Sequence, residues 1–199
     1  MARKRTARTV SDPRVLRGIA HPLRNRILSE LYATGPMRAA DVAAALGVPA
    51  NQASFHLRQL AKYGLVAEAP EEARDGRDRV WKVAIDNGVS FNFREVEAAP
   101  GGRAVGNVLR RNIEQRAHHT IDAALNRPED ESTDDIHVML SDSAIRLTKD
   151  EAVEFASDLT AFFDTWREKT MGKGDGRQTY SLLQVLQPYP STLEEPEDS

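Results

Sequence analysis

The chain has 199 residues, with 27 Lys and Arg, 30 Asp and Glu, five His and no Cys. That length allows one domain or two small ones. The lack of cysteine excludes disulfides, thiolate metal sites and cysteine nucleophiles. No apolar run reaches the roughly 18 residues that a membrane span needs, and no apolar stretch follows the basic N-terminus to make a signal peptide. We therefore expect a cytoplasmic protein with no membrane partner.

The formal net charge of -3 hides two halves of opposite sign. Residues 1–84 hold 15 basic and 8 acidic side chains, a net charge of +7, whereas residues 85–199 hold 12 and 22, a net charge of -10. Such asymmetry indicates a module that binds a polyanion, joined to a second unit. Two oppositely charged solvated surfaces would give the same arithmetic.

The first half is predicted to contain four short helices. Ser11 or Asp12 can cap a first helix that begins at Pro13. Pro22 begins a second helix, and Gly35 followed by proline ends it. A third helix of about two turns covers residues 41–46 and stops at Gly47, which can adopt the positive φ of a helix C-terminus. Pro49 opens a fourth helix that runs to Tyr63. The apolar stripes are Val15, Leu16 and Ile19 in the first helix, Leu23, Ile27, Leu28 and Leu31 in the second, and Val42, Ala45 and Leu46 in the third.

The fourth helix has an apolar face and a polar face. Its apolar residues share one face, so the polar face is directed toward solvent or a partner; the two sets are Ala53, Leu57, Leu60 and Ala61, and Asn51, Gln52, Ser54, Phe55, Arg58 and Lys62. Two short helices joined by residues 47–49 predict a helix-turn-helix whose second helix enters the major groove. Asn and Gln can pair with adenine, Arg with guanine or phosphate, and Phe can pack on a thymine methyl. An ordinary solvated helix face is the alternative.

A β-hairpin is predicted directly after this helix. Residues 65–67 read as one strand, Asp75 and Gly76 as the turn, and residues 79–83 as the second strand. This hairpin would form a wing that reaches the DNA backbone. Its candidate DNA-binding residues are Arg74, Arg77 and Arg79. Four acidic residues in the same loop reduce its positive charge: Glu71, Glu72, Asp75 and Asp78. The N-terminal arm adds the basic residues Arg3, Lys4, Arg5 and Arg8.

Four sequence motifs in this half resemble the winged helix-turn-helix of ArsR-type bacterial transcription regulators. They are IAHPLRNRIL at 19–28, DVAAALGV at 41–48, ASFHLRQL at 53–60 and YGLV at 63–66. The resemblance implies that Asn51, Gln52, Ser54 and Phe55 reach base edges, that Arg58 contacts phosphate, and that His56 is a packing residue. It also implies a homodimer, usually a repressor, on a palindromic operator in double-stranded DNA. Two departures are Arg38, where a Ser or Thr cap is usual, and Pro49, which replaces a small polar residue.

The second half is predicted to begin with a long helix over residues 103–125. Its apolar stripe, which the resemblance assigns to dimerisation, could instead pack within its own chain; it consists of Val105, Leu109, Ile113, Ala117, Ile121 and Ala124 or Leu125. Glu114, His118 and Asp122 share one face of this helix. They could bind a metal or simply form a polar surface, and we expect no cofactor.

A compact β-β-α-β module is predicted to follow. Strands at 136–140 and 144–147 precede a capping box at 148–151 and a helix to about Thr170, and a last strand covers residues 180–186. The helix's apolar face could cover the sheet as core or line a small-molecule pocket; it consists of Val153, Phe155, Ala156, Leu159, Phe162, Phe163 and Trp166. This order resembles the C-terminal part of a group of actinobacterial winged-helix regulators.

Together these features predict an α+β, mainly helical chain. Its expected parts are a basic arm (1–12), a winged helix-turn-helix (13–90), a linker and dimerisation helix (91–128), the α+β module (129–188) and an acidic disordered tail (189–199). We expect a sequence-specific DNA-binding regulator and no enzyme, because no placement of polar groups argues for catalysis. The alternatives are a protein-interaction module that docks a partner through the winged helix, and a sensor of a small-molecule effector with its pocket in the C-terminal module.

Overall fold

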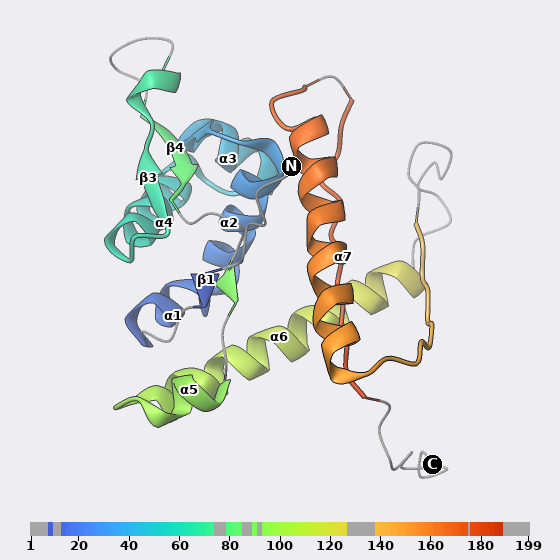
Figure 1. Cartoon of the computed structure of the whole chain (residues 1–199). Helices are drawn as coiled ribbons and strands as arrows, with labels where there is room; N and C mark the ends of the chain where they lie inside the picture. Colours follow the sequence, from blue (N-terminus) through green and yellow to red (C-terminus); the bar gives the residue numbers. More distant parts are fainter. Residues whose placement is uncertain are drawn as a thin grey trace.

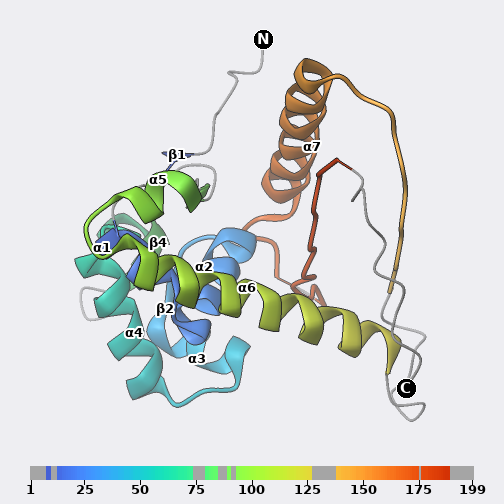
Figure 2. The same ribbon diagram turned by 90° about the horizontal axis from the view of Figure 1, so that it is seen from below.

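The structure is a computed structural model that describes residues 8–9, 13–73, 79–84, 89–90, 93–126, 138–174 and 176–188. Within these ranges it is α+β and mainly helical, as predicted (Figure 1). Helices α1 to α4 and a small sheet form one group, α6 runs beneath them, and α7 stands beside α2 (Figures 1 and 2). Most of the N-terminal arm, the acidic linker at 129–135 and the tail at 189–199 lie outside the described residues.

The first two helices begin where the prolines predict. Helix α1 spans Pro13–Ile19 and α2 spans Pro22–Thr34. His21 caps α2, because its Nδ1 accepts a hydrogen bond from the Leu23 amide at 3.2 Å. Gly35 ends α2 with a φ of 97°, a conformation that L side chains rarely adopt. The local capping signals therefore set both ends of α2.

A three-stranded antiparallel sheet borders these helices in the order β2-β4-β3. Strand β3 (Val66–Glu68) and strand β4 (Val80–Val83) form the predicted hairpin, with Val66 opposite Val83. Strand β2 (Met37–Arg38) was not predicted and pairs with the other edge of β4. A further short parallel pair joins β1 (Arg8–Thr9) to β5 (Val89–Ser90).

The core lies where α1, α2, α3 and α4 meet. Its fully buried side chains include Leu16, Ile27, Leu31, Val42, Leu57, Leu60 and Leu65. Burying one such aliphatic side chain stabilises the fold by about 1.5–3 kcal/mol. Val96, Val105 and Leu109 from the second half belong to the same cluster, but most of the hydrophobic core comes from the helix-turn-helix region.

Helices α5 (Phe93–Ala98) and α6 (Gly102–Leu125) follow, and only α6 was predicted. A Cβ on Gly102 would lie 1.7 Å from the Val96 carbonyl oxygen, so the tight turn between the two helices requires glycine. The α6 stripe divides along its length. Val105 and Leu109 are buried in the core of their own chain, whereas Ile121 and Leu125 are exposed.

Helix α7 (Lys149–Thr170) has the predicted capping box. The Thr148 amide donates to Glu151 Oε2 at 2.7 Å, and the Glu151 amide donates to Thr148 Oγ1 at 3.3 Å. The end of α7 docks on α2, because the Gly172 amide donates to the Thr34 carbonyl at 3.1 Å and Thr179 Oγ1 donates to Glu30 Oε1 at 2.9 Å.

The strands predicted on either side of α7 are not formed, which corrects the β-β-α-β module. Residues 138–147 and 177–188 are described as irregular chain, and they lie apart in both views (Figures 1 and 2). Residues 136 and 137 lie outside the described residues. A strand is stabilised by backbone hydrogen bonds to a neighbouring strand, and no described strand pairs with either segment. Phe155, Phe162 and Trp166 of α7 are exposed, so among the described residues they do not form the core that would cover a sheet.

Candidate nucleic-acid interface

The third and fourth helices form the predicted helix-turn-helix. Helix α3 (Ala39–Leu46) ends at Gly47, which has a φ of 63°, and helix α4 spans Ala50–Lys62. The Val48 amide donates to the Ala43 carbonyl at 3.0 Å, which closes the end of α3. The left-handed residue reverses the chain within three residues, so α4 begins directly against α3.

The unusual Arg38 does not leave the start of α3 uncapped. Its backbone amide donates to Asp41 Oδ2 at 3.3 Å, and its guanidinium donates to both carboxylate oxygens of Asp41, at 2.8 and 2.7 Å. Asp41 therefore supplies the reciprocal half of a capping box, and its charge also lies in the first turn, where the helix dipole favours an anion.

The two faces of α4 differ as the sequence predicts. Ala53, Leu57 and Leu60 are fully buried and fix the helix on the core. The candidate base-reading and phosphate-binding residues occupy the other side: Asn51, Gln52, Phe55, Arg58 and Lys62 are exposed, and Ser54 is half-buried.

The exposed side of α4 combines amide, guanidinium and aromatic groups on one rigid helix. Asn51 Oδ1 accepts a hydrogen bond from the Gln52 amide at 2.8 Å, so it helps to cap the first turn. Pro49 provides no side-chain cap there. Phe55 has an exposed fraction of 50% and adds an aromatic group to this otherwise polar face. The groups that discriminate base edges and the groups that bind phosphate are therefore available together.

The wing contributes less positive charge than its arginines suggest. Arg79 forms an ion pair with Glu68 at 3.6 Å, and Lys82 forms one with Glu71. Arg74 and Arg77 lie outside the described residues, as do Arg3 and Arg5 of the arm. Among the described residues, α4 is thus the part of the candidate interface whose basic groups, Arg58 and Lys62, have no ion-pair partner.

A pair of histidines, His56 of α4 and His21 before α2, packs on the buried side of α4. The rings of His21 and His56 lie 4.5 Å apart between centroids, and His56 is buried, as a packing residue should be. Burial lowers the pKa of both imidazoles, and Arg24 nearby lowers both further. Within the described residues His56 Nδ1 makes no hydrogen bond. The sequence signals missed this pair, because the two residues are 35 positions apart.

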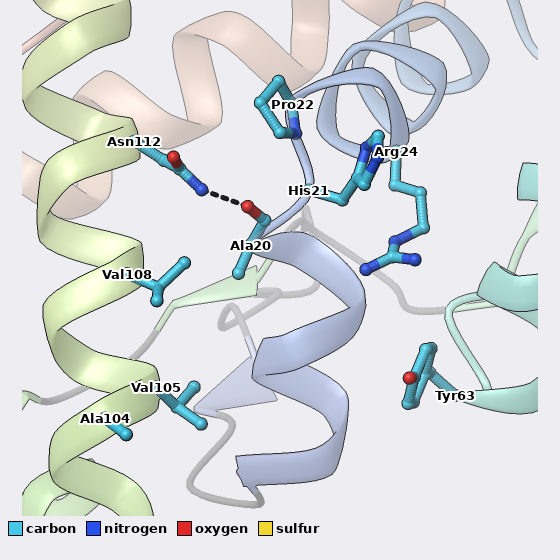
Figure 3. Close-up of a pocket in the computed structure, with 9 residues that line it drawn as sticks. All are labelled: Ala20, His21, Pro22, Arg24, Tyr63, Ala104, Val105, Val108 and Asn112. Atoms are coloured by element: carbon cyan, nitrogen blue, oxygen red, sulfur yellow. Dashed lines mark hydrogen bonds between the residues drawn. The ribbon is translucent and has the colours of Figure 1, made fainter.

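A cavity of about 620 Å³ lies between the α1–α2 junction, the end of α4 and α6 (Figure 3). Its walls are Ala20, His21, Pro22, Arg24, Tyr63, Ala104, Val105, Val108 and Asn112. Asn112 donates a hydrogen bond to the Ala20 carbonyl, and Arg24 Nε donates to the Gly18 carbonyl at 2.7 Å. The sequence-based sensor hypothesis placed a pocket in the C-terminal module, whereas this cavity adjoins the helix-turn-helix.

The metal site raised by the sequence finds no support in the described part of the chain. The residues Glu114, His118 and Asp122 do not form a metal site there, since no group of three or more potential ligands comes together. No helix in that part has the length and apolar character needed to cross a membrane.

Comparisons with known proteins found one family model and solved structures that match this chain. Residues 19–69 match the family model of a helix-turn-helix domain. A solved structure titled "Crystal structure of Possible transcriptional regulator for arsenical resistance" is 24% identical, and the match covers 58% of this chain and 97% of that chain with a TM-score of 0.30. No curated protein matches.

The fold and the exposed chemistry of α4 define a helix-turn-helix domain, the class of module with which many DNA-binding regulators read the major groove. The domain match confirms the helix-turn-helix that the four motifs predicted, over residues 19–69, which contain all four.

Proposed function

We propose that this chain is a transcriptional repressor that binds a palindromic operator as a homodimer. The observation that carries the proposal is the division of α4: three residues of one face are fully buried, and the opposite face presents Asn51, Gln52, Phe55 and Arg58 to solvent. A helix fixed in this way can present its side chains to the major groove with little reorganisation, which favours specific readout.

The two kinds of contact have separable roles. Gln52 can form a bidentate pair with adenine, worth about 1–3 kcal/mol of discrimination against a wrong base. Arg58 lies six residues further along the helix and suits a phosphate, a contact that sets affinity and salt dependence without reading sequence. Arg74, Arg77 and Arg79 of the wing and Arg3 and Arg5 of the arm would add flanking contacts.

A two-fold dimer would place two copies of α4 in successive major grooves, about 34 Å apart, and this matches a palindromic operator. An occupied operator that overlaps a promoter excludes polymerase, which is the simplest route to repression. The second half has a net charge of -10, and its repulsion from the phosphates favours an orientation in which this half lies away from the DNA.

The test is a salt titration of binding to the DNA upstream of the chain's own gene. Arg58→Ala should weaken binding to operator and random DNA alike and reduce the slope of log K against log salt by about two, since the dimer loses one phosphate contact in each subunit. Gln52→Ala should instead reduce the preference for operator over random DNA by at least about 30-fold, since the dimer loses one such pair, worth about 1–3 kcal/mol, in each subunit. Arg146→Ala is the matched control, because it removes an exposed arginine far from α4 in sequence and should change neither quantity.

Unchanged affinity and footprint in both α4 variants would refute the assignment of this helix. A chain that forms no salt-sensitive specific complex at all would favour the interaction module, in which the exposed Phe55 docks a protein.

The cavity favours a second candidate function, a response to a small-molecule effector. Its volume falls in the range of ligand pockets, and its walls are mostly apolar with a few polar groups. Tyr63 directly follows α4, so a ligand there would press on the recognition helix. Fragment screening by NMR should perturb the resonances of Val108 and Tyr63; binding that leaves both unperturbed, or no binding, would reject this candidate.

A further inference from the structure

Helix α7 carries an apolar seam whose large aromatic side chains are not covered by the described part of the chain. Positions 152, 155, 159, 162 and 166 recur at alternating intervals of three and four, the spacing of a helix that packs along another helix. They are occupied by Ala152, Phe155, Leu159, Phe162 and Trp166. Phe155, Phe162 and Trp166 have exposed fractions of 37, 57 and 49%, and no residue of α7 is fully buried.

The rest of the chain holds α7 by a different part of its surface. The end of the helix docks on α2, where the Arg167 guanidinium lies 5.5 Å from the centre of the Tyr32 ring and Met171 packs near Gly35. The Gly172 and Thr179 hydrogen bonds continue this attachment. Phe155, Phe162 and Trp166 of the seam are therefore presented outward on an anchored helix, with Ala152 and Leu159 half-buried between them.

The seam exposes apolar surface on the scale of the centre of an interface. With about 150–250 Å² for a large aromatic side chain, the exposed parts of Phe155, Phe162 and Trp166 add up to roughly 200–350 Å². A standard interface buries about 800 Å² on each partner, with an apolar centre and a polar rim. The seam would supply that centre, and the polar residues of α7 beside it would supply the rim.

The seam is self-complementary when two copies run antiparallel. With the two-fold axis at Leu159, Phe155 of one copy faces Phe162 of the other, and the small Ala152 faces the large Trp166. This alternation of large and small side chains fills the space between two helices. A parallel pair would instead place Trp166 against Trp166.

The charges of α7 also favour the antiparallel pair. Residues 149–159 have a net charge of -3 and residues 160–170 a net charge of zero. A parallel pair would align the two acidic halves, whereas the antiparallel pair separates them and also opposes the two helix dipoles.

We propose that α7 is a dimer interface whose occupant is α7 of a second copy of this chain, antiparallel, with Leu159 at the two-fold axis. The proposal rests on the homodimer of the proposed function, but it does not depend on which residues read DNA. It moves the main contact from α6, whose Val105 and Leu109 are buried within the chain, to the seam of α7.

Because the chain lacks cysteine, single engineered cysteines can test both contact and direction. In the antiparallel pair Leu159→Cys lies opposite itself and should form a disulfide-linked dimer under mild oxidation. Ala152→Cys should remain monomeric on a denaturing gel, since the two copies of position 152 would be about 21 Å apart at 1.5 Å per residue, beyond the reach of a disulfide. Cross-linking of both variants would overturn the antiparallel arrangement, and cross-linking of neither would overturn the interface.

A second measurement on the full chain is its oligomeric state by sedimentation equilibrium. Phe162→Glu should weaken dimerisation at least 100-fold, because the substitution buries two carboxylates. Ala161→Glu adds the same charge at an exposed position turned away from the seam and should leave the dimer intact. Circular dichroism of both variants checks that α7 remains helical.

The outcomes separate this proposal from the proposed function. A wild-type dimer that survives Phe162→Glu would overturn the α7 interface and leave the homodimeric repressor standing. A wild-type chain that is monomeric at all concentrations would overturn both the interface and the homodimer, whereas the Arg58→Ala and Gln52→Ala titrations would still report on DNA reading by α4.

Discussion

Substitution of Gly47 isolates the backbone requirement of the helix-turn-helix. This residue has a φ of 63°, and a Cβ added to it would meet no atom within 4 Å. Gly47→Ala therefore adds no clash, and its cost is that of placing an L residue in the left-handed region, about 1–2 kcal/mol. Gly47→Asn should cost less, because asparagine tolerates this conformation better than alanine.

Urea unfolding followed by circular dichroism measures this cost. With a slope of about 2 kcal/mol/M, the midpoint of Gly47→Ala should fall by roughly 0.5–1 M and that of Gly47→Asn by less. Gly174→Ala is the control, since Gly174 has no positive φ and equal space around its Cβ position, and its midpoint should stay within about 0.25 M of wild type. If Gly47→Ala unfolds at the same urea concentration as Gly174→Ala, the argument that the turn needs a left-handed residue fails.

Three further predictions concern the support of α4 and the wing. Burial lowers the folded-state pKa of His21 and His56, so below about pH 6.5 the unfolded chain binds more protons than the folded chain, and stability should fall as the pH drops from 7 to 5. His56→Phe should flatten the plot of melting temperature against pH. An unchanged plot would contradict burial of His56 as the cause. Leu57→Ala should lower the free energy of unfolding by about 2–5 kcal/mol because the side chain is fully buried, and a loss under 1 kcal/mol in urea would show that the site collapses. Arg79→Ala should change stability by less than about 0.5 kcal/mol, since its ion pair with Glu68 is solvent-exposed, and a larger change in thermal melting would contradict this.

Local signals were sufficient to predict the elements that position the candidate interface. Proline at the first helical position marks α2, and the capping box marks α7; both signals act within four residues of the helix start. The division of α4 into a buried and an exposed face also follows from spacing alone, because 3.6 residues per turn fixes which side chains share a face.

Features that depend on pairing between distant segments were not predictable in the same way. Strand β2 consists of two residues whose partner in β4 lies more than 40 positions later. The α6 stripe looks uniform in the sequence, yet Val105 is buried and Leu125 is exposed, because only the first turns of α6 reach the core. The strands expected near α7 had suitable alternation but no neighbouring strand within the described chain. Alternation of polar and apolar residues predicts which side chains share a face, whereas a strand also needs a neighbouring strand to accept and donate its backbone hydrogen bonds.

The attachment of α7 to α2 links the two proposals physically. Helix α2 packs against α3 and α4 through its buried Ile27, Leu28 and Leu31, and its other end bonds to the segment after α7 through Thr34. In two chains joined along α7, the helix α2 of each chain would therefore connect the dimer contact to the recognition helix α4, with no flexible linker between them. The distance between the two copies of α4 would then be set by the dimer itself, which is what recognition of half-sites at a fixed spacing requires.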